Sequence, residues 1–295
     1  MIDKEILKKI KNIEIHSRKF VNEVFSGEYH SVFKGVGINF SECREYYPGD
    51  DTRFIDWNVT ARIGKPYIKV FDEERQLNLV LMIDASSSAF FSTAQKSKLE
   101  IAAELSGILA FSALQNNDKV GVIIFSDIIE KYLPPKTGKK NSLRIIREML
   151  TFTPKNCQTN ISKALEFAIK TFKRKSVIFL ISDFFDKNYE KNLALLSKKH
   201  DLTNVIITDI RDLILENCGI INFRDIETGE DIYLDTTDKK ILEEFKDCNK
   251  RRLENIERTF AKYNADIIKL NSEKSYIDSL IAYFKKRIRQ INRNH

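Results

Sequence analysis

The chain has 295 residues, and 42% of them are hydrophobic, which is enough for one large domain or for one domain with an appendage. Its 49 lysines and arginines exceed its 42 acidic residues, but charges of both signs alternate through most of the chain, which is not typical of a nucleic-acid-binding protein. No stretch approaches the roughly 20 apolar residues of a membrane span, and the N-terminus lacks the features of a secretory signal. We therefore expect a cytoplasmic protein, and attachment to a membrane complex through partners stays an open alternative.

The first 75 residues predict a small N-terminal unit made of a helix and a β element. Isoleucines and a leucine recur at spacings of three and four residues over residues 1 to about 24, which predicts an amphipathic helix with a lysine-rich outer face. From Ser26 to Gln76 the chain is rich in glycines, aromatic residues and paired charges. A turn at residues 48–51 and the alternating segment Tyr67 to Phe71 indicate short β-strands there.

Residues 76–295 predict one large α/β domain. Four segments are apolar on consecutive residues, as expected for strands of a parallel sheet that is covered on both faces. Helical periodicity separates them, from about Ala94 to Gln115, after Ile161, and in shorter stretches near 142–151 and 189–199. This alternation predicts an open, doubly wound, mostly parallel sheet flanked by helices. The predicted strands are Leu77–Ile83, Lys119–Phe125, Ser176–Ile181 and Thr203–Thr208.

The C-terminal part of this domain predicts a hairpin inserted at residues 219–235, a charged helix at about 238–263, a strand at 265–270 and a last helix at about 275–291. No acidic residue occurs from Phe284 to His295, whereas five basic residues do. We interpret them as the solvated face of the last helix, with binding of RNA or an anionic surface as the alternative. The five are Lys285, Lys286, Arg287, Arg289 and Arg293.

A cluster of oxygen-bearing side chains follows the first strand of the α/β domain, in the stretch LNLVLMIDASSSAFF from Leu77 to Phe91. Alternate residues of an extended segment share a side, and the carboxyl ends of parallel strands form the usual binding edge of such a sheet. A second strand runs into another aspartate, and a threonine precedes the helix at Ile161. Hard oxygen ligands of this kind suit Mg²⁺. The candidate metal ligands are Asp84, Ser86, Ser88, Thr159 and Asp183.

The serine cluster by itself is also compatible with a helix cap, and the aspartate with bonds to neighbouring amides. Together with Thr159 and Asp183, however, the D-A-S-S-S segment resembles the metal-ion-dependent adhesion site of the von Willebrand factor A domain. The resemblance implies hydroxyl ligands at Ser86, Ser88 and Thr159, and carboxylates at Asp84 and Asp183 that act directly or through water. It also implies Mg²⁺, with Mn²⁺ or Ca²⁺ as substitutes, and an acidic residue of a partner protein that completes the coordination. Cys157 and Gln158 stand where such sites often have glycines.

A second resemblance covers nearly the whole chain. The segments Gly35 to Arg75 and Gly219 to Glu230 resemble the bacterial domain-of-unknown-function 58 family, in which a small N-terminal element precedes a von Willebrand A-type domain. Members are typically encoded beside MoxR-type AAA+ ATPases. The resemblance therefore implies a non-enzymatic adaptor or assembly factor that works with such an ATPase.

The Gly35 to Arg75 signature also has a physical interpretation of its own. Its arginines and aspartates predict a network of bidentate ion pairs, with Trp57, Tyr46 and Tyr47 packed over it. The network either fastens the N-terminal element to the large domain or forms a docking surface for the partner. The charged residues concerned are Arg44, Asp50, Asp51, Arg53, Asp56 and Arg62.

The principal alternative is a Mg²⁺-dependent phosphoryl-transfer enzyme with Asp84 as its nucleophile. Phosphatases of the haloacid dehalogenase type use D-x-D, but Ala85 and Ser86 follow Asp84 here, so the second carboxylate is missing. The Gly138-Lys139-Lys140 segment lacks the upstream glycine and the following hydroxyl residue of a phosphate-binding loop. We therefore expect neither enzymatic activity nor a nucleic-acid partner.

Overall fold

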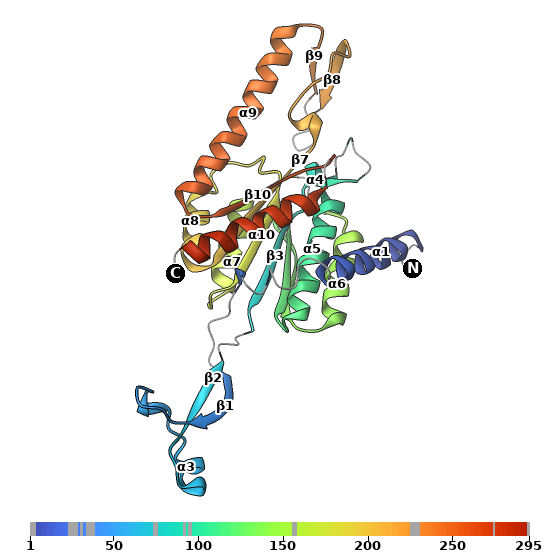
Figure 1. Ribbon diagram of the computed structural model, residues 1–295. Coiled ribbons are helices and arrows are strands. Elements are labelled where there is room, and N and C mark those ends of the chain that lie inside the picture. Colours follow the sequence, from blue (N-terminus) through green and yellow to red (C-terminus); the bar gives the residue numbers. More distant parts are fainter. Residues whose placement is uncertain are drawn as a thin grey trace. The chain divides into compact units, whose positions relative to one another are not determined.

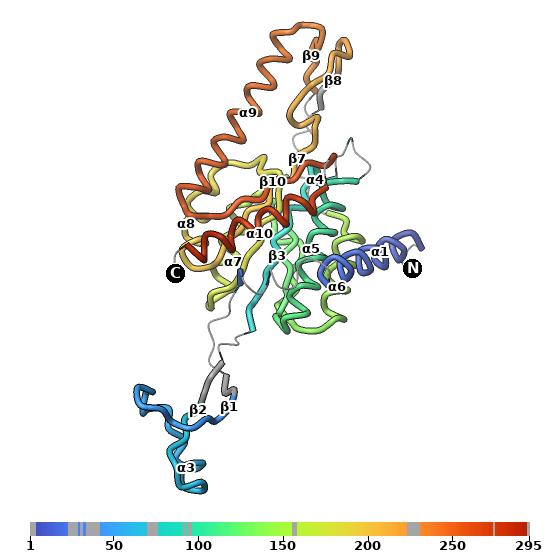
Figure 2. Tube along the Cα trace, in the orientation of Figure 1, coloured from blue at the N-terminus to red at the C-terminus, as the bar shows by residue number. Residues whose placement is uncertain are grey.

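The computed structural model describes residues 4–22, 29, 32–33, 39–72, 76–90, 93, 96–154, 158–224, 231–273 and 275–293. It has two compact units, one made of Met1–Val32 with Asn78–His295 and the other of Phe33–Leu77. Figure 1 labels most of the elements of both units, and Figure 2 traces the Cα atoms. The start of the Gly35 signature, the predicted helix start at Ala94, Cys157 and the turn at residues 227–230 lie outside the described residues.

A six-stranded sheet forms the centre of the larger unit, in the order β10-β7-β6-β3-β4-β5. Neighbouring strands are parallel except β4 and β5, which are antiparallel. If the six strands of this sheet are numbered 1 to 6 in chain order, their order in the sheet is 6-5-4-1-2-3. The predicted doubly wound, mostly parallel sheet is therefore confirmed. The strands are β3 (Asn78–Asp84), β4 (Lys119–Phe125), β5 (Ile129–Lys136), β6 (Val177–Ser182), β7 (Asp201–Thr208) and β10 (Asp266–Asn271).

Strand β5 was not among the predicted strands. It carries two prolines, Pro134 and Pro135, and its residues are mostly half-exposed rather than continuously apolar. Proline cannot donate a backbone hydrogen bond, so within sheets it is confined to edges and bulges. Strand β5 is an edge strand, and its pairing with β4 carries two register shifts, one of them at Gly121. The sequence pattern of an edge strand therefore differs from that of the four central strands.

Helices cover both faces of this sheet (Figure 1). On one face, residues of α7 (Ile161–Thr171) and α8 (Glu190–Lys199) share a buried core with Val80 and Met82 of β3. On the other, Tyr283 of α10 (Tyr276–Arg293) bonds to Thr203 of β7, and α5 (Lys98–Gln115) and α6 (Lys139–Leu150) pack against β4. The short helix α4 (Ser87–Phe90) follows β3 directly.

Helix α5 starts later than the predicted position near Ala94. Ser97 is its N-cap: the Ser97 hydroxyl accepts from the Glu100 amide, and the Glu100 carboxylate accepts from the Ser97 amide. This reciprocal capping box satisfies two backbone donors at the helix start, so the first helical residue is Lys98.

The N-terminal helix α1 (Lys4–Phe20) belongs to the larger unit, so the predicted boundary at residue 75 is wrong for it. Figure 1 shows α1 beside α5 and α6, and its residues Ile13 and Ser17 are buried. A Cβ on Gly107 of α5 would lie 2.7 Å from Ile13 Cγ2 and 3.0 Å from Ser17 Oγ. The apolar face of α1 thus finds its partner about 90 residues further along the chain, where a glycine allows close approach.

Gly107→Val is expected to loosen α1 from α5, because the added side chain would overlap the β-branched Ile13 side chain. We expect a loss of about 1–3 kcal/mol in the free energy of unfolding, as is usual for overpacked contacts. Amide hydrogen exchange of residues 4–20 should accelerate while that of the central strands changes little. Unchanged exchange in residues 4–20 would contradict this packing.

The basic C-terminal residues do not behave alike. Lys285, Lys286, Arg289 and Arg293 of α10 are exposed, as predicted. Arg287 is the exception, because 15% of its side chain is exposed and it pairs with Asp201 and Asp266. The interpretation of a solvated basic face is therefore wrong for Arg287, because its charge pairs with two aspartates within the fold.

The predicted hairpin is present as the antiparallel pair β8 (Ile220–Arg224) and β9 (Asp231–Asp235). It is followed by α9 (Lys239–Lys262), whose residues Ile256 and Phe260 join the core under α7 and α8. A single 3-10 turn, η3 (Ile210–Asp212), follows β7. Among the described residues, no helix has the length and apolarity needed to cross a bilayer.

The smaller unit contains the predicted β element. Strands β1 (Asn39–Glu45) and β2 (Tyr67–Asp72) pair antiparallel, with a bulge between residues 40 and 42. Between them lie the 3-10 turn η2 (Thr52–Phe54) and the short helix α3 (Trp57–Ile63), which ends at Gly64 in the left-handed conformation. Helix α3 was not predicted, since seven residues are too few for a clear helical period.

Candidate functional site

Three of the predicted metal ligands meet at the carboxyl end of β3. Asp84 is the last residue of the strand, and 5% of it is exposed. Its Oδ1 accepts a hydrogen bond from the Ser86 amide at 3.0 Å, and the hydroxyl oxygens of Ser86 and Ser88 are 3.1 Å apart. Its Oδ2 accepts from the hydroxyl of Ser182, the last residue of β6, at 2.6 Å. A carboxylate and two hydroxyls are therefore held together at one edge of the sheet.

Asp183 brings a second carboxylate to the same place. It follows β6, which is the parallel neighbour of β3, and it is buried. Burial of Asp84, followed by the negative charge of Asp183, raises the pKa of Asp84 to about 7. The two carboxylates thus share a water-poor site in which a further positive charge would be favourable.

A cavity of about 10 Å³ lies between these side chains. A space of this size holds about one water-sized species. Its lining includes Asp84, Ser88, Ser182 and Asp183, together with Lys98 of α5. The structure therefore brings Asp84, Ser88 and Asp183 to one small space, and it places Ser86 in hydrogen-bond contact with Ser88.

Thr159 is not among the residues that line this cavity. It is half-buried and lies two residues before α7. The loop is held by the neighbouring residues: the Asn160 amide donates to the Ser126 carbonyl at 3.0 Å, and the Ile161 amide donates to Asp186 at 2.6 Å. The role of Thr159 as a metal ligand stays a prediction.

Two residues at this site were missed by sequence reasoning. Ser182 directly precedes Asp183, so the same strand-end argument would have found it. Lys98 stands at the start of a helix whose residues are mostly apolar and buried. A lysine in such a position was the sequence signal that could have pointed to it. Its ammonium lies 2.9 Å from Asp183 Oδ2 and 2.7 Å from Asp212 Oδ2, with 4% of the side chain exposed.

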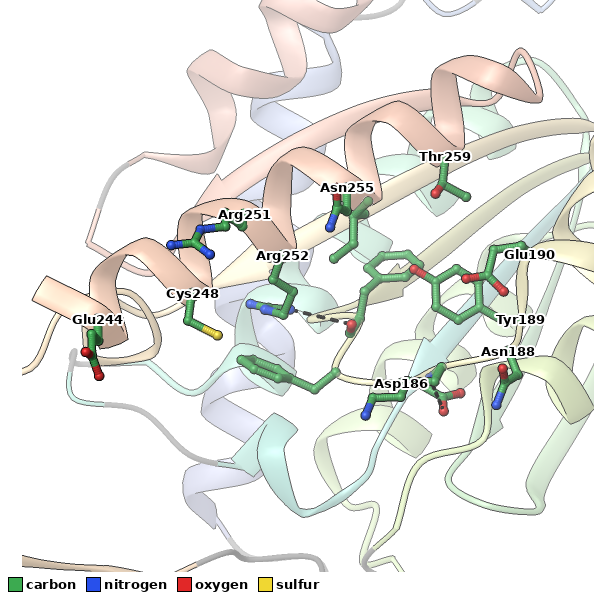
Figure 3. A pocket seen from close by; sticks show the side chains of 14 residues that line it. Asp186, Asn188, Tyr189, Glu190, Glu244, Cys248, Arg251, Arg252, Asn255 and Thr259 are labelled. Carbon is green, nitrogen blue, oxygen red and sulfur yellow. Dashed lines mark hydrogen bonds between the residues drawn. The ribbon is translucent and has the colours of Figure 1, made fainter. Parts of the chain in front are cut away.

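A larger pocket of about 1000 Å³ adjoins the site, between the segment that follows Asp183 and helix α9. Figure 3 shows Asp186, Tyr189 and Glu190 on one side and Arg251 and Arg252 of α9 on the other. The Arg252 guanidinium lies 3.5 Å from the centre of the Phe185 ring and donates to the Asp183 carbonyl at 3.0 Å. Helix α9 thereby fixes the backbone that carries Asp183.

The donor set fits a small, hard cation. It consists of carboxylate and hydroxyl oxygens, which Mg²⁺ prefers over nitrogen or sulfur. Among the described residues there is no group of three or more His, Cys, Asp and Glu side chains that could hold a metal. A cation at this edge would therefore depend on the serine hydroxyls as well as on the two carboxylates.

The predicted network in the smaller unit is instead two separate ion pairs. Arg44 makes two hydrogen bonds of 2.8 Å to Asp50, and this partner lowers the pKa of the Asp50 carboxyl. Arg53 pairs with Asp51, and its hydrogen bonds lower the pKa of Asp51 to about 2. Each arginine pairs with an aspartate that is a few residues away in the chain. Each ion pair is therefore formed locally, and the two pairs stay separate.

The other members of the predicted network have different roles. Asp56 caps α3 by accepting from the amides of Asn58 and Val59, and it lies 3.5 Å from Lys69. Arg62 has no ion pair within the described part of the chain. Trp57 does not pack over the ion pairs, because 71% of it is exposed. The prediction of one joined network, and of Trp57 as part of its cover, is therefore wrong, whereas Tyr47 does pack against the first ion pair, with the Arg44 guanidinium carbon 5.6 Å from the centre of its ring.

The doubly wound sheet, with its antiparallel edge strand and Asp-x-Ser-x-Ser at the carboxyl end of β3, defines a von Willebrand factor A-type domain. The chain belongs to the family described as "Protein of unknown function DUF58", whose model matches residues 42–255. This match confirms the resemblance carried by Gly35 to Arg75 and Gly219 to Glu230. The family description assigns no activity.

Similar proteins include an uncharacterized protein of Mycobacterium tuberculosis, 23% identical over 290 residues, with 97% of this chain and 91% of the relative covered. Among solved structures, BatB from Bacteroides thetaiotaomicron is 16% identical with a TM-score of 0.46, covering 72% of this chain and 99% of BatB. The SpRpn10 VWA domain is 13% identical with a TM-score of 0.37, covering 70% of this chain and 94% of that domain.

Proposed function

We propose that this protein is a non-enzymatic interaction module that binds a divalent cation at the carboxyl edge of β3 and β6 and uses it to hold an acidic group of a partner protein. The cation is Mg²⁺, with Mn²⁺ or Ca²⁺ as substitutes. The observation that carries the proposal is the meeting of Asp84 and Asp183 with serine hydroxyls around a cavity of about 10 Å³.

The residues of the proposed site have different roles. Ser86, Ser88 and the carboxylates of Asp84 and Asp183 would hold the ion, with Thr159 as a further hydroxyl ligand from the loop before α7. The Ser86 amide and the Ser182 hydroxyl orient the Asp84 carboxylate. When bound, the cation supplies a coordination position that attracts a carboxylate of the partner. No residue in this arrangement is assigned to bond breaking.

The proposed partner is a MoxR-type AAA+ ATPase in the cytoplasm, which follows from the family resemblance. The smaller unit offers a candidate docking surface for such a partner. Trp57 and Ile63 of α3 are 71% and 52% exposed, and Phe54 of η2 is 41% exposed. Exposed aromatic and arginine side chains are the residue types that contribute most to protein interfaces. Arg62, without an ion pair in the described chain, belongs to the same short helix.

The two alternative functions are less well supported. A phosphoryl-transfer enzyme would need a second carboxylate two residues after Asp84, and Ser86 occupies that position. Binding of RNA or an anionic surface through α10 would rest on its four exposed basic residues, because Arg287 is engaged with Asp201 and Asp266. We therefore propose a binding role without catalysis.

The test is capture of a purified MoxR-type ATPase on immobilised protein, with magnesium chloride or with EDTA. We expect wild-type protein to retain the ATPase with Mg²⁺ and to release it in EDTA, and Asp84→Ala to retain little in either buffer. Asp247→Ala is the matched control, because Asp247 is an exposed aspartate of α9 that lies outside the cavity lining. Equal retention under all conditions would remove the metal from the mechanism, and no retention by wild type would remove this partner.

A further inference from the structure

Lys98 places a buried positive charge at the proposed metal site. It is the first residue of α5, and the capping box of Ser97 and Glu100 fixes that position. Only 4% of its side chain is exposed. Burial of an ammonium group is costly unless carboxylates compensate for the lost water. Asp183 and Asp212 do so here, at 2.9 Å and 2.7 Å from the Lys98 nitrogen.

The two proposed carboxylate ligands therefore differ in the charge of the groups that bond to them. Asp183 Oδ2 already has a cationic partner in Lys98, whereas its Oδ1 accepts a long contact of 3.4 Å from the Phe185 amide. Within the part of the chain that the structure describes, the hydrogen bonds to Asp84 come from neutral donors, the Ser86 amide and the Ser182 hydroxyl. Lys98, Asp84 and Asp183 all line the same one-water cavity. A divalent ion in that cavity would share Asp183 with the ammonium group and would be repelled by it.

We propose that Lys98 is a built-in cation that competes with the divalent ion for Asp183 and thereby keeps the affinity of the site for Mg²⁺ low. This inference rests on the proposed function of the site and adds a determinant of its regulation. In the metal-free protein Lys98 occupies Asp183 and stabilises the site. Asp212 gives the ammonium a second partner, so a bound metal does not leave Lys98 without a counter-charge.

The test is calorimetric titration of magnesium chloride into wild type, Lys98→Met and Lys98→Met/Asp84→Ala, with thermal unfolding in EDTA and in Mg²⁺. Removing the competing charge should tighten Mg²⁺ binding by about tenfold or more, because ligand charge tunes such sites. Lys98→Met should also unfold at a lower temperature than wild type in EDTA and gain more from Mg²⁺. Lys96→Met is the matched control, since Lys96 pairs with Glu104 and lies outside the cavity lining.

Asp212→Asn tests the same inference from the opposite direction and does not depend on the folding of Lys98→Met. Loss of Asp212 leaves Asp183 as the main counter-charge of Lys98, so Mg²⁺ should bind more weakly than to wild type. Binding to Lys98→Met that is no tighter than to wild type, or a double variant that binds as tightly as Lys98→Met, would overturn the inference. So would stronger binding to Asp212→Asn.

The same titrations separate the inference from the proposed function. Mg²⁺ binding to wild type that Lys98→Met leaves unchanged refutes the role of Lys98 and keeps the metal site. Binding to Lys98→Met that requires Asp84, with none to wild type, supports the role of Lys98 and refutes Mg²⁺ binding by the native protein. Absence of binding to every variant refutes both.

Discussion

Asp84→Asn is expected to stabilise the metal-free protein and at the same time to abolish its response to Mg²⁺. Asp84 is buried, and burial together with the charge of Asp183 raises its pKa to about 7, against 3.8 for the unfolded chain. Because the folded state holds this proton more tightly, folding stability falls as pH rises from about 4 to about 7. Asparagine carries no charge, so the variant does not lose folding stability in this way as the pH rises. We expect a gain of about 1–3 kcal/mol at pH 8, reduced by the weaker hydrogen bond to Ser182.

Urea unfolding in EDTA at pH 5 and pH 8 measures this effect, followed by the same curves with magnesium chloride. The stability difference between Asp84→Asn and wild type should grow from pH 5 to pH 8. Mg²⁺ should raise the stability of wild type at pH 8 and leave Asp84→Asn unchanged, because a ligand stabilises only the state that binds it. A variant less stable than wild type at both pH values would indicate that Asp84 serves the fold alone. Asp247→Asn, at an exposed site, should match wild type throughout.

Arg287→Ala is expected to destabilise the protein by about 3 kcal/mol, the scale found when one partner of a buried ion pair is removed. The Arg287 guanidinium pairs with Asp201, lies 3.2 Å from Asp266 and donates to the Tyr283 hydroxyl at 2.6 Å. Burial already raises the pKa of Asp266, and the positive charge of Arg287 counteracts part of that rise. Without the arginine, two aspartates at the start of β7 and β10 would be left facing each other.

Chemical denaturation of Arg287→Ala beside Arg289→Ala checks this prediction. Arg289 is an exposed residue of the same helix, so its replacement should change the free energy of unfolding by less than about 0.5 kcal/mol. Equal effects of the two substitutions would show that Arg287 contributes no more than a surface charge. A large loss for Arg287 alone would explain why the basic C-terminal stretch is not a uniform surface for anionic partners.

Features that depend on local periodicity could be predicted from the sequence. The four central strands are apolar on consecutive residues because both faces of the sheet are covered, and each was found within one or two residues. The hairpin β8–β9 and the long helix α9 follow the same logic. The members of the cluster Asp84, Ser86 and Ser88 could be predicted too, but not its geometry: β3 ends at Asp84 and Ser88 lies in α4, so the turn from strand to helix, and not an extended segment, brings the two hydroxyls together.

Features that depend on a distant partner could not be predicted. Strand β5 is a strand only because β4 offers an unpaired edge, and α1 is placed by a glycine on α5. The sequence by itself determined the order of the four central strands and of the helices between them, and the two aspartates at neighbouring strand ends. Only the tertiary structure decided which charges became buried: Lys98 meets Asp183 and Asp212 across 85 and 114 residues. Whether a lysine is solvated or paired depends on which carboxylates the fold brings within about 4 Å of it, and a pattern of charges along the chain carries no such distance.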